Sequence, residues 1–433
     1  MTTSSITGIT MRLKPVSMGL TPRQSVGLLK FARWTAISIV LVYFIRGTVL
    51  PWYLHVPYSI WIGLTILALS VGAGAAVIGG GKWRWGWVAV LCSFAASIFL
   101  AEQPISAGLH WFGIVLLVLA VGPVIPNPIA VRLRFIAWEF LTMGLTTLTG
   151  IFVIWYLLHL PSFGGMVYFT GFMNQSMLLG PIAGMGVAIA LARAIHGRSW
   201  KWAVVATLGL IPLLASGSRV AACATGVAVC LLLFRRKPVL GGICALVFPV
   251  ALYAMIALGH QEEEGGSFTG ALAHKGMENS RTDLWRCRID EFVSSPIIGI
   301  GVAMGTGSGS EQDSKGDIRV EPGSSYLALL AMTGAVGTLA FFSALAYLLY
   351  RFSFATKGAG LEMDILSVVG IYMAVHGVAE GWILGFGSPL CFIFWLWLGR
   401  FADVALKPAR AVIKQPVRNY RRFRYFVPVP SKS

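Results

Sequence analysis

The chain has 433 residues, of which 56% are hydrophobic and only 12% are charged, a balance that excludes a water-soluble protein. Runs of roughly 17–25 apolar residues are long enough to cross a bilayer as helices, and about twelve such runs follow one another along the chain. A net charge of +17 alone would suit a nucleic-acid-binding protein. The basic residues lie instead in the tails and in alternate loops, which argues against a nucleic-acid partner.

The fold class expected from these runs is all-α, a polytopic integral membrane protein. Its even number of spans puts both termini on one side, together with most of the 34 Lys and Arg residues. Basic loops stay in the cytoplasm, so this side is predicted to be cytoplasmic. The spans are expected at residues 34–53, 57–79, 85–101, 107–126, 134–160, 174–193, 200–215, 219–234, 239–258, 325–349, 363–384 and 388–405.

Around the spans we expect two cytoplasmic basic tails and one long periplasmic loop. The first 33 residues are too polar for a signal peptide, and the C-terminal tail is expected to meet anionic membrane lipids. Five of the six cysteines lie in spans, so we expect no disulfide framework, and no metal-ligand spacing is present. The parts are 1–33 (tail), 34–258 (first nine spans), 259–324 (loop), 325–405 (last three spans) and 406–433 (tail).

The long loop is predicted to contain one short amphipathic helix. Ser280 and Asp283 have the spacing of a capping box, and Pro296 ends the pattern. Arg286 points away from the apolar face of this helix. No acidic residue is expected on the apolar face. A guanidinium on that face needs an anionic partner, and a diphosphate supplies paired hydrogen bonds. The residues expected on the apolar face are Arg281, Leu284, Trp285, Arg288, Ile289 and Phe292.

Two further arginines lie at the outer ends of spans. Arg219 follows Ser216-Gly217-Ser218 at the start of the eighth span, where the helix N-terminus attracts a phosphate. Arg46 lies near the outer end of the first span. We assign both to diphosphate binding, with Arg281 and Arg288. The alternative for each is an arginine that extends to the lipid headgroups.

Two pairs of polar residues are candidates for chemistry and for glycan binding. His376 and Glu380 are one helical turn apart in the eleventh predicted span, where either could accept a proton from a sugar hydroxyl. The alternative is a buried pair that stabilises helix packing. Asn174 and Gln175 precede the sixth span and either bind a sugar or cap the helix.

Three motifs together resemble those of the O-antigen polymerase and O-antigen ligase superfamily, the Wzy and WaaL types. They are Ser216-Gly217-Ser218-Arg219, the arginine–ten–glycine pattern from Arg288 to Gly299, and Pro322-Gly323-Ser324-Ser325-Tyr326-Leu327. The resemblance implies a membrane glycosyltransferase of the C type that needs no metal and no cofactor. Its substrates would be undecaprenyl-diphosphate-linked oligosaccharides. We place Tyr326 with Asn174 and Gln175 in glycan binding.

The third motif departs from the superfamily pattern. Ligases especially have a histidine before Tyr-Leu, where this chain has Gly323-Ser324-Ser325. The departure favours a polymerase of exopolysaccharide repeat units, of which the xanthan type is one form, acting at the periplasmic face of the inner membrane. The partners expected are a chain-length regulator and a flippase of the same pathway. The alternatives are a ligase that transfers glycan to lipid A core and a secondary transporter or lipid-linked glycan flippase.

Overall fold

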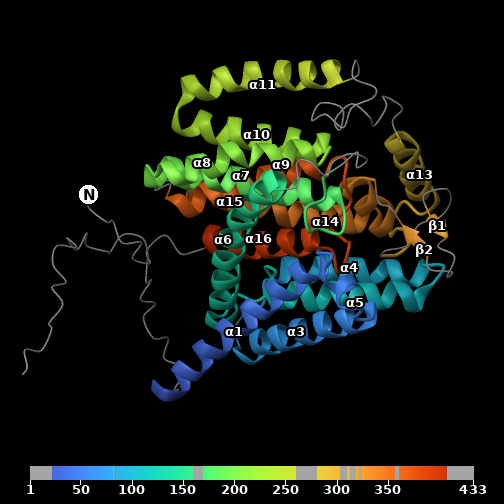
Figure 1. Ribbon diagram of the computed structural model, residues 1–433. Helices are drawn as coiled ribbons and strands as arrows, with labels where there is room; N and C mark the ends of the chain where they lie inside the picture. The colour runs from blue at the N-terminus through green and yellow to red at the C-terminus, as the bar shows by residue number, and fades with distance from the viewer. Residues whose placement is uncertain are drawn as a thin grey trace, which may run out of the picture.

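The structure, a computed structural model, is a bundle of helices with a short hairpin at one end (Figure 1). It describes residues 22–80, 82–158, 169–259, 280–302, 310–312, 318–320, 323–355 and 360–406.

The secondary structure of the described residues is helical apart from two short antiparallel strands, in which Glu311 opposes Arg319. The helices are α1 (Pro22–Arg46), α2 (Leu50–Tyr53), α3 (Tyr58–Ile78), α4 (Trp85–Ala96), η1 (Ser97–Leu100), α5 (Pro104–Val121), α6 (Pro128–Leu158), α7 (Ser176–Gly197), α8 (Trp200–Leu208), α9 (Leu210–Ala215), α10 (Arg219–Arg236), α11 (Pro238–Gly259), α13 (Ser280–Ser294), α14 (Ser325–Ala355), α15 (Leu361–His376) and α16 (Pro389–Ala405). The strands are β1 (Ser310–Gln312) and β2 (Ile318–Val320).

Every predicted span coincides with one helix or with two consecutive helices. The span predicted at 200–215 is divided at Gly209 into α8 and α9. Among the described residues, five helices are long and apolar enough to cross a membrane by length and composition: α3, α5, α6, α7 and α14. The helical, apolar character of the fold is therefore confirmed, and the number of twelve crossings stays a prediction.

One predicted span ends earlier than expected. The span at 363–384 corresponds to α15, which stops at His376, and residues 377–388 form turns before α16 begins. Glycines at 377, 381, 385 and 387 interrupt this stretch, and glycine is the residue that most often follows the last turn of a helix. The segment 377–388 therefore lies outside the helices and is free to contact the neighbouring helix ends.

Helix α16 is the centre of the bundle. It packs against α14, α6, α5 and α15, and nearly all of its side chains are buried. A helix that is apolar on every side is stable only when other helices surround it. Ser388 caps its N-terminus by accepting a hydrogen bond from the Leu390 amide at 3.3 Å. The segment 377–388 is thus anchored to the core through α16.

The bundle has two ends, because successive helices run in opposite directions. Helix α10 packs against α15 and α7, and Arg236 at its last turn contacts Asp364 at the first turn of α15. The two helices are therefore antiparallel, and Arg219 lies at the opposite end, roughly 25 Å away at 1.5 Å per residue. That end is called the Arg219 end below, and it also holds the end of α15.

The other end, called the Asp403 end, buries its charges in ion pairs. Asp403 accepts hydrogen bonds from Arg134 at 2.7 and 2.8 Å and from Arg84 at 3.3 Å. Asp364 accepts bonds from Arg236 at 2.8 Å and contacts His196 at 2.6 Å. A buried charge is tolerated only with such partners. These pairs hold the helix ends together on the side that the charge pattern predicts to be cytoplasmic.

Candidate functional site at the Arg219 end

The turn before Arg219 is built by its own sequence. Gly217 has φ +67°, which side chains with a Cβ rarely adopt. Ser218 is the N-cap residue of α10 and accepts a hydrogen bond from the Ala221 amide at 3.3 Å. Arg219 follows as the first helical residue, and its side chain is half-buried. The Ser-Gly-Ser-Arg motif therefore places one guanidinium at a helix N-terminus.

Helix α7 approaches this turn closely. A Cβ atom on Gly180 would meet the side chains of Ser216 and Ser218 at 2.8 Å, so only glycine fits there. The same helix begins one residue after Gln175, and the amide of Asn174 donates to the carbonyl of Gly47 at 3.1 Å. The residues predicted to bind glycan thus lie at the same end as Arg219.

Arg46 joins them from α1, of which it is the last residue. Its half-buried guanidinium packs against the backbone of Gly387, whose φ is +90°. A side chain at position 387 would displace the guanidinium. Arg46 therefore contacts the segment 377–388, the segment that also contains Glu380.

Gln175 occupies the N-cap position of α7, but its side chain makes no capping hydrogen bond. The capping alternative is therefore wrong for Gln175. Its assignment to glycan binding, like that of Asn174, stays a prediction.

The expectation that His376 and Glu380 share one helical face is wrong. His376 is the last residue of α15, whereas Glu380 lies in the turn beyond it, where its amide donates to the His376 carbonyl at 3.2 Å. His376 is only 1% exposed, and its ring stacks on Tyr372 with centroids 5.5 Å apart. Glu380 is half-buried. Of the two side chains, that of Glu380 is the more exposed.

Tyr326 also lies at this end, in the first turn of α14. Its hydroxyl donates a 2.6 Å hydrogen bond to the carbonyl of Ala374 in the last turn of α15. The final carbonyls of a helix have no partner within the helix, so this bond satisfies one of them. The hydroxyl is therefore engaged with backbone, and the ring is the part of Tyr326 that remains for a glycan.

The predicted short helix is present as α13, and two of its predicted contacts need correction. Arg286 is exposed and lies 3.9 Å from Asp283, on the opposite side from the buried Arg288, as predicted. Ile289, expected on the buried face, is 48% exposed. The side chain of Arg281 lies outside the described residues.

Arg288 has an acidic partner, contrary to the prediction that no acid shares its face. Its Nη1 atom lies 2.6 Å from the carboxylate of Glu291, and the two side chains are 2% and 1% exposed. Residues three apart on a helix are neighbours, so the spacing of Arg288 and Glu291 in the sequence is sufficient to indicate this pair. The indole of Trp285 donates to the Gly323 carbonyl at 3.2 Å, which joins α13 to the start of α14.

The glycine of the arginine–ten–glycine pattern has a structural role. Gly299 has φ +78°, and a Cβ atom on it would collide with the backbone of Met332 and Thr333 in α14. Helix α14 is interrupted there at Gly334, whose φ is +63°.

The interruption frees backbone groups that the chain after α13 then satisfies. The amides of Ile300 and Gly301 donate to α14, and its amides at Ala335 and Val336 donate back to Pro296 and Ile297, at 2.8–3.1 Å. Gly299 therefore allows the chain that follows α13 to pack directly on the backbone of α14.

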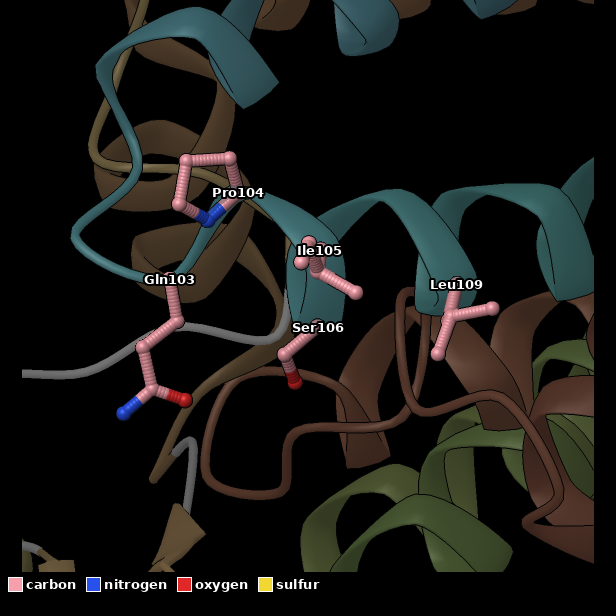
Figure 2. A pocket seen from close by; sticks show the side chains of 5 residues that line it. All are labelled: Gln103, Pro104, Ile105, Ser106 and Leu109. Atoms are coloured by element: carbon pink, nitrogen blue, oxygen red, sulfur yellow. The ribbon is translucent and has the colours of Figure 1, made fainter.

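A shallow hollow of about 370 Å³ lies at the start of α5 and contains none of the predicted site residues (Figure 2). Its wall is mostly apolar, from Pro104, Ile105 and Leu109, with Gln103 and Ser106 beside them. Because none of these side chains is charged, the hollow offers no counter-ion for a diphosphate.

The comparison with protein families agrees with the motifs. Residues 202–342 match the family model described as O-antigen ligase. The matched part runs from α8 into α14 and includes Arg219, Arg288, Gly299 and Tyr326, whereas Arg46 and Glu380 lie outside it. No curated protein matches the chain.

The match confirms the resemblance to the O-antigen polymerase and ligase superfamily. Its members are membrane glycosyltransferase-like enzymes, and the family implies substrates that are lipid-linked glycans. Together with the apolar helices, it indicates a multi-pass membrane protein.

Proposed function

We propose that this protein polymerises undecaprenyl-diphosphate-linked oligosaccharide repeat units into a surface or secreted polysaccharide, at the periplasmic face of the inner membrane. One observation carries the proposal. Three helices, α1, α7 and α10, and the segment 377–388 bring Arg46, Arg219, Gln175 and Glu380 to one end of the bundle. Two guanidiniums and a reachable carboxylate at one end suit an anionic leaving group and a hydroxyl nucleophile.

In the proposed mechanism Arg219 and Arg46 hold the diphosphate of the donor. The terminal hydroxyl oxygen of the acceptor attacks the anomeric carbon of the donor glycan, and the bond from that carbon to the diphosphate oxygen breaks. The hydroxyl proton passes to Glu380, and the lipid diphosphate leaves with its negative charge. Preorganised cations stabilise such developing charge. The energy of the bond comes from the diphosphate, so no nucleotide is consumed.

Arg288 needs a different account within this proposal. Because it is buried against Glu291, it binds a diphosphate only if α13 opens or if the anion replaces Glu291 as its partner. We therefore assign the first contact with the donor to Arg219 and Arg46. We assign Arg281 and Arg288, both on α13, to a second set of contacts with the diphosphate.

A ligase that transfers glycan to lipid A core is the second candidate, favoured by the description of the matching family. The third motif argues for the polymerase. Gly323-Ser324-Ser325 stands where ligases have a histidine before Tyr-Leu, and the hydroxyls of both serines bond to backbone carbonyls of the segment 377–388. Neither hydroxyl is in a position to replace an imidazole.

Deletion of the gene separates the candidates. A polymerase mutant should accumulate single repeat units on the lipid carrier and make no high-mass polysaccharide. A ligase mutant should accumulate long lipid-linked chains, and a flippase or transporter mutant should retain single units on the cytoplasmic leaflet. Long lipid-linked chains in the deletion strain would overturn the polymerase proposal.

A further inference from the structure

The first turn of α14 is bonded to the segment that follows α15. The hydroxyl of Ser325 donates to the carbonyl of Glu380 at 2.7 Å and accepts from the amide of Trp382 at 3.0 Å. Its own amide donates to the carbonyls of Gly377 at 2.9 Å and Glu380 at 3.1 Å. One residue of α14 thus makes four hydrogen bonds to residues 377–382.

These bonds are protected from water. Ser325 is 1% exposed and Trp382 is 3% exposed. The ring of Trp382 packs on Phe394 of α16, with centroids 5.0 Å apart. Residues 377–382 are therefore held from two sides, by a serine hydroxyl on α14 and by the packing of the Trp382 indole on Phe394 of the central helix α16. A buried hydrogen bond whose partner is removed leaves an unsatisfied group, which makes its loss costly.

The hydrogen bonds of the Ser325 hydroxyl lie on both sides of the residue that follows Glu380. Glu380 lies beyond His376, the last residue of α15, and its amide donates to the His376 carbonyl at 3.2 Å. The Ser325 hydroxyl joins residues 380 and 382 on either side of Gly381, so it sets the backbone from which the Glu380 side chain extends. We propose that Ser325 is a positioning residue, whose hydrogen bonds hold Glu380 at the same end of the bundle as Arg219 and Arg46. This inference rests on the proposed function, in which Glu380 accepts the proton.

The neighbouring serine supplies a matched control. Ser324 is equally buried, at 3% exposure, but its hydroxyl makes one long bond of 3.4 Å to the Gly377 carbonyl. Ser324→Ala therefore removes the same atoms from the same turn without releasing residues 380–382. Any effect that Ser325→Ala has beyond this control belongs to the bonds with Glu380 and Trp382.

The assay uses purified full-length protein and the lipid-linked single units extracted from the deletion strain. Ser325→Ala should lower kcat about tenfold and leave the KM for the lipid-linked unit within about twofold, because the reacting carboxylate moves while the diphosphate contacts stay. Ser324→Ala should leave both constants within about twofold. Equal constants for the two variants would overturn the inference.

A double variant tests whether Ser325 acts through Glu380. If it does, Ser325→Ala combined with Glu380→Gln should be no slower than Glu380→Gln alone, since the two changes remove one function. Additive losses would show that Ser325 acts elsewhere. Should Ser325→Ala not accumulate in membranes, Ser325→Cys keeps a side chain of similar shape and replaces the hydroxyl with a thiol, a weaker donor and acceptor. It should lower kcat severalfold with an unchanged KM, and an unchanged kcat would contradict the inference.

The same series separates failure of the inference from failure of the proposed function. Slow Glu380→Gln protein with normal Ser325→Ala protein would reject the positioning role alone. Full activity of Glu380→Gln, and of His376→Gln beside it, would reject the proton-acceptor assignment on which that role depends.

Discussion

The two ends of the helical bundle differ in how their charged side chains are buried. At the Asp403 end, buried carboxylates lie between arginines: Asp403 contacts both Arg134 and Arg84. At the Arg219 end, half-buried guanidiniums lie beside glycine turns, at Gly217 and Gly387. A buried pair holds helices together, whereas a half-buried cation at the surface of a turn is accessible to an anionic ligand. The difference supports the proposal that one end stabilises the bundle and the other carries the chemistry.

The helix α13 extends this comparison. Although it lies outside the predicted spans, its Arg288–Glu291 pair is as buried as the pairs of the Asp403 end. Figure 1 shows α13 and the β1–β2 hairpin at the right-hand end of the view, beyond the helices that they follow. The pair lies within α13, and the attachment of α13 to α14 comes instead from the Trp285–Gly323 bond and from the backbone bonds of Ile300 and Gly301 to α14.

The largest effect is expected from breaking the Asp403 end. Asp403→Ala leaves the fully buried Arg134 guanidinium without its carboxylate, at a cost of about 3–5 kcal/mol. The midpoint of thermal unfolding in detergent should fall clearly, while the activity of the protein that remains folded should be unchanged. The exposed Asp290→Ala on α13 is the control. Equal midpoints for the two variants would contradict a stabilising role for this end.

The next effect compares the two ends of a single helix, α10. Arg219→Ala should lower polymer yield about a hundredfold, because removal of a group that stabilises the leaving charge has an effect of this order. Arg235→Ala, at the other end, removes an exposed bond of 2.9 Å to Ser367 and should change the yield less than about twofold. Both proteins should be present in membranes at the wild-type level. A similar loss from both variants would remove the distinction between the ends.

A smaller effect is expected on α13. Arg288→Lys keeps the charge but loses the planar fork of the guanidinium, so we expect polymer yield to fall several-fold. Arg286→Lys, on the exposed side of the same helix, should be close to wild type. Measurement of both at equal protein level checks the assignment of faces, and equal yields would show that the buried side of α13 has no special role.

The smallest effect is a shift in pH dependence. Burial raises the pKa of the Cys287 thiol, and the nearby Glu291 carboxylate raises it further. The thiolate is the form that reacts with maleimides, so Cys287 should react slowly at neutral pH and faster as the pH rises above the usual thiol range. The control is Ser294→Cys, at an exposed position of α13, in a protein without Cys287.

An impermeant maleimide added to whole cells also reports which side α13 faces. The prediction is labelling of both positions from outside at high pH. Equal rates at neutral pH would contradict the burial of Cys287, and labelling only after lysis would place α13 in the cytoplasm.

The apolar runs predicted the helices well. A membrane-spanning helix forms all of its backbone hydrogen bonds within itself, so its signal lies in consecutive residues of the sequence. The end of α15 was missed at Gly377, although the glycines that follow His376 signal it. The sequence likewise contains a signal for the partner of Arg288, because Glu291 follows it by three residues and so lies beside it on the helix.

Other features could not be predicted from one sequence. Arg134 and Asp403 pair across 269 positions of the chain, and Ser325 reaches Glu380 across 55. Such contacts depend on how the helices are arranged around α16, and neither residue pattern nor charge spacing specifies that arrangement. The candidate site was predicted as a set of residues, and its geometry came only with the fold.

The central claim is that the Arg219 end joins lipid-linked repeat units without another energy source. The most direct test is purified protein in vesicles with lipid-linked single units and no nucleotide. The account predicts a ladder of longer lipid-linked glycans, with one lipid diphosphate released for each new glycosidic bond and neither product formed by Arg219→Ala protein. No ladder, together with transfer of single units to added lipid A core, would contradict it.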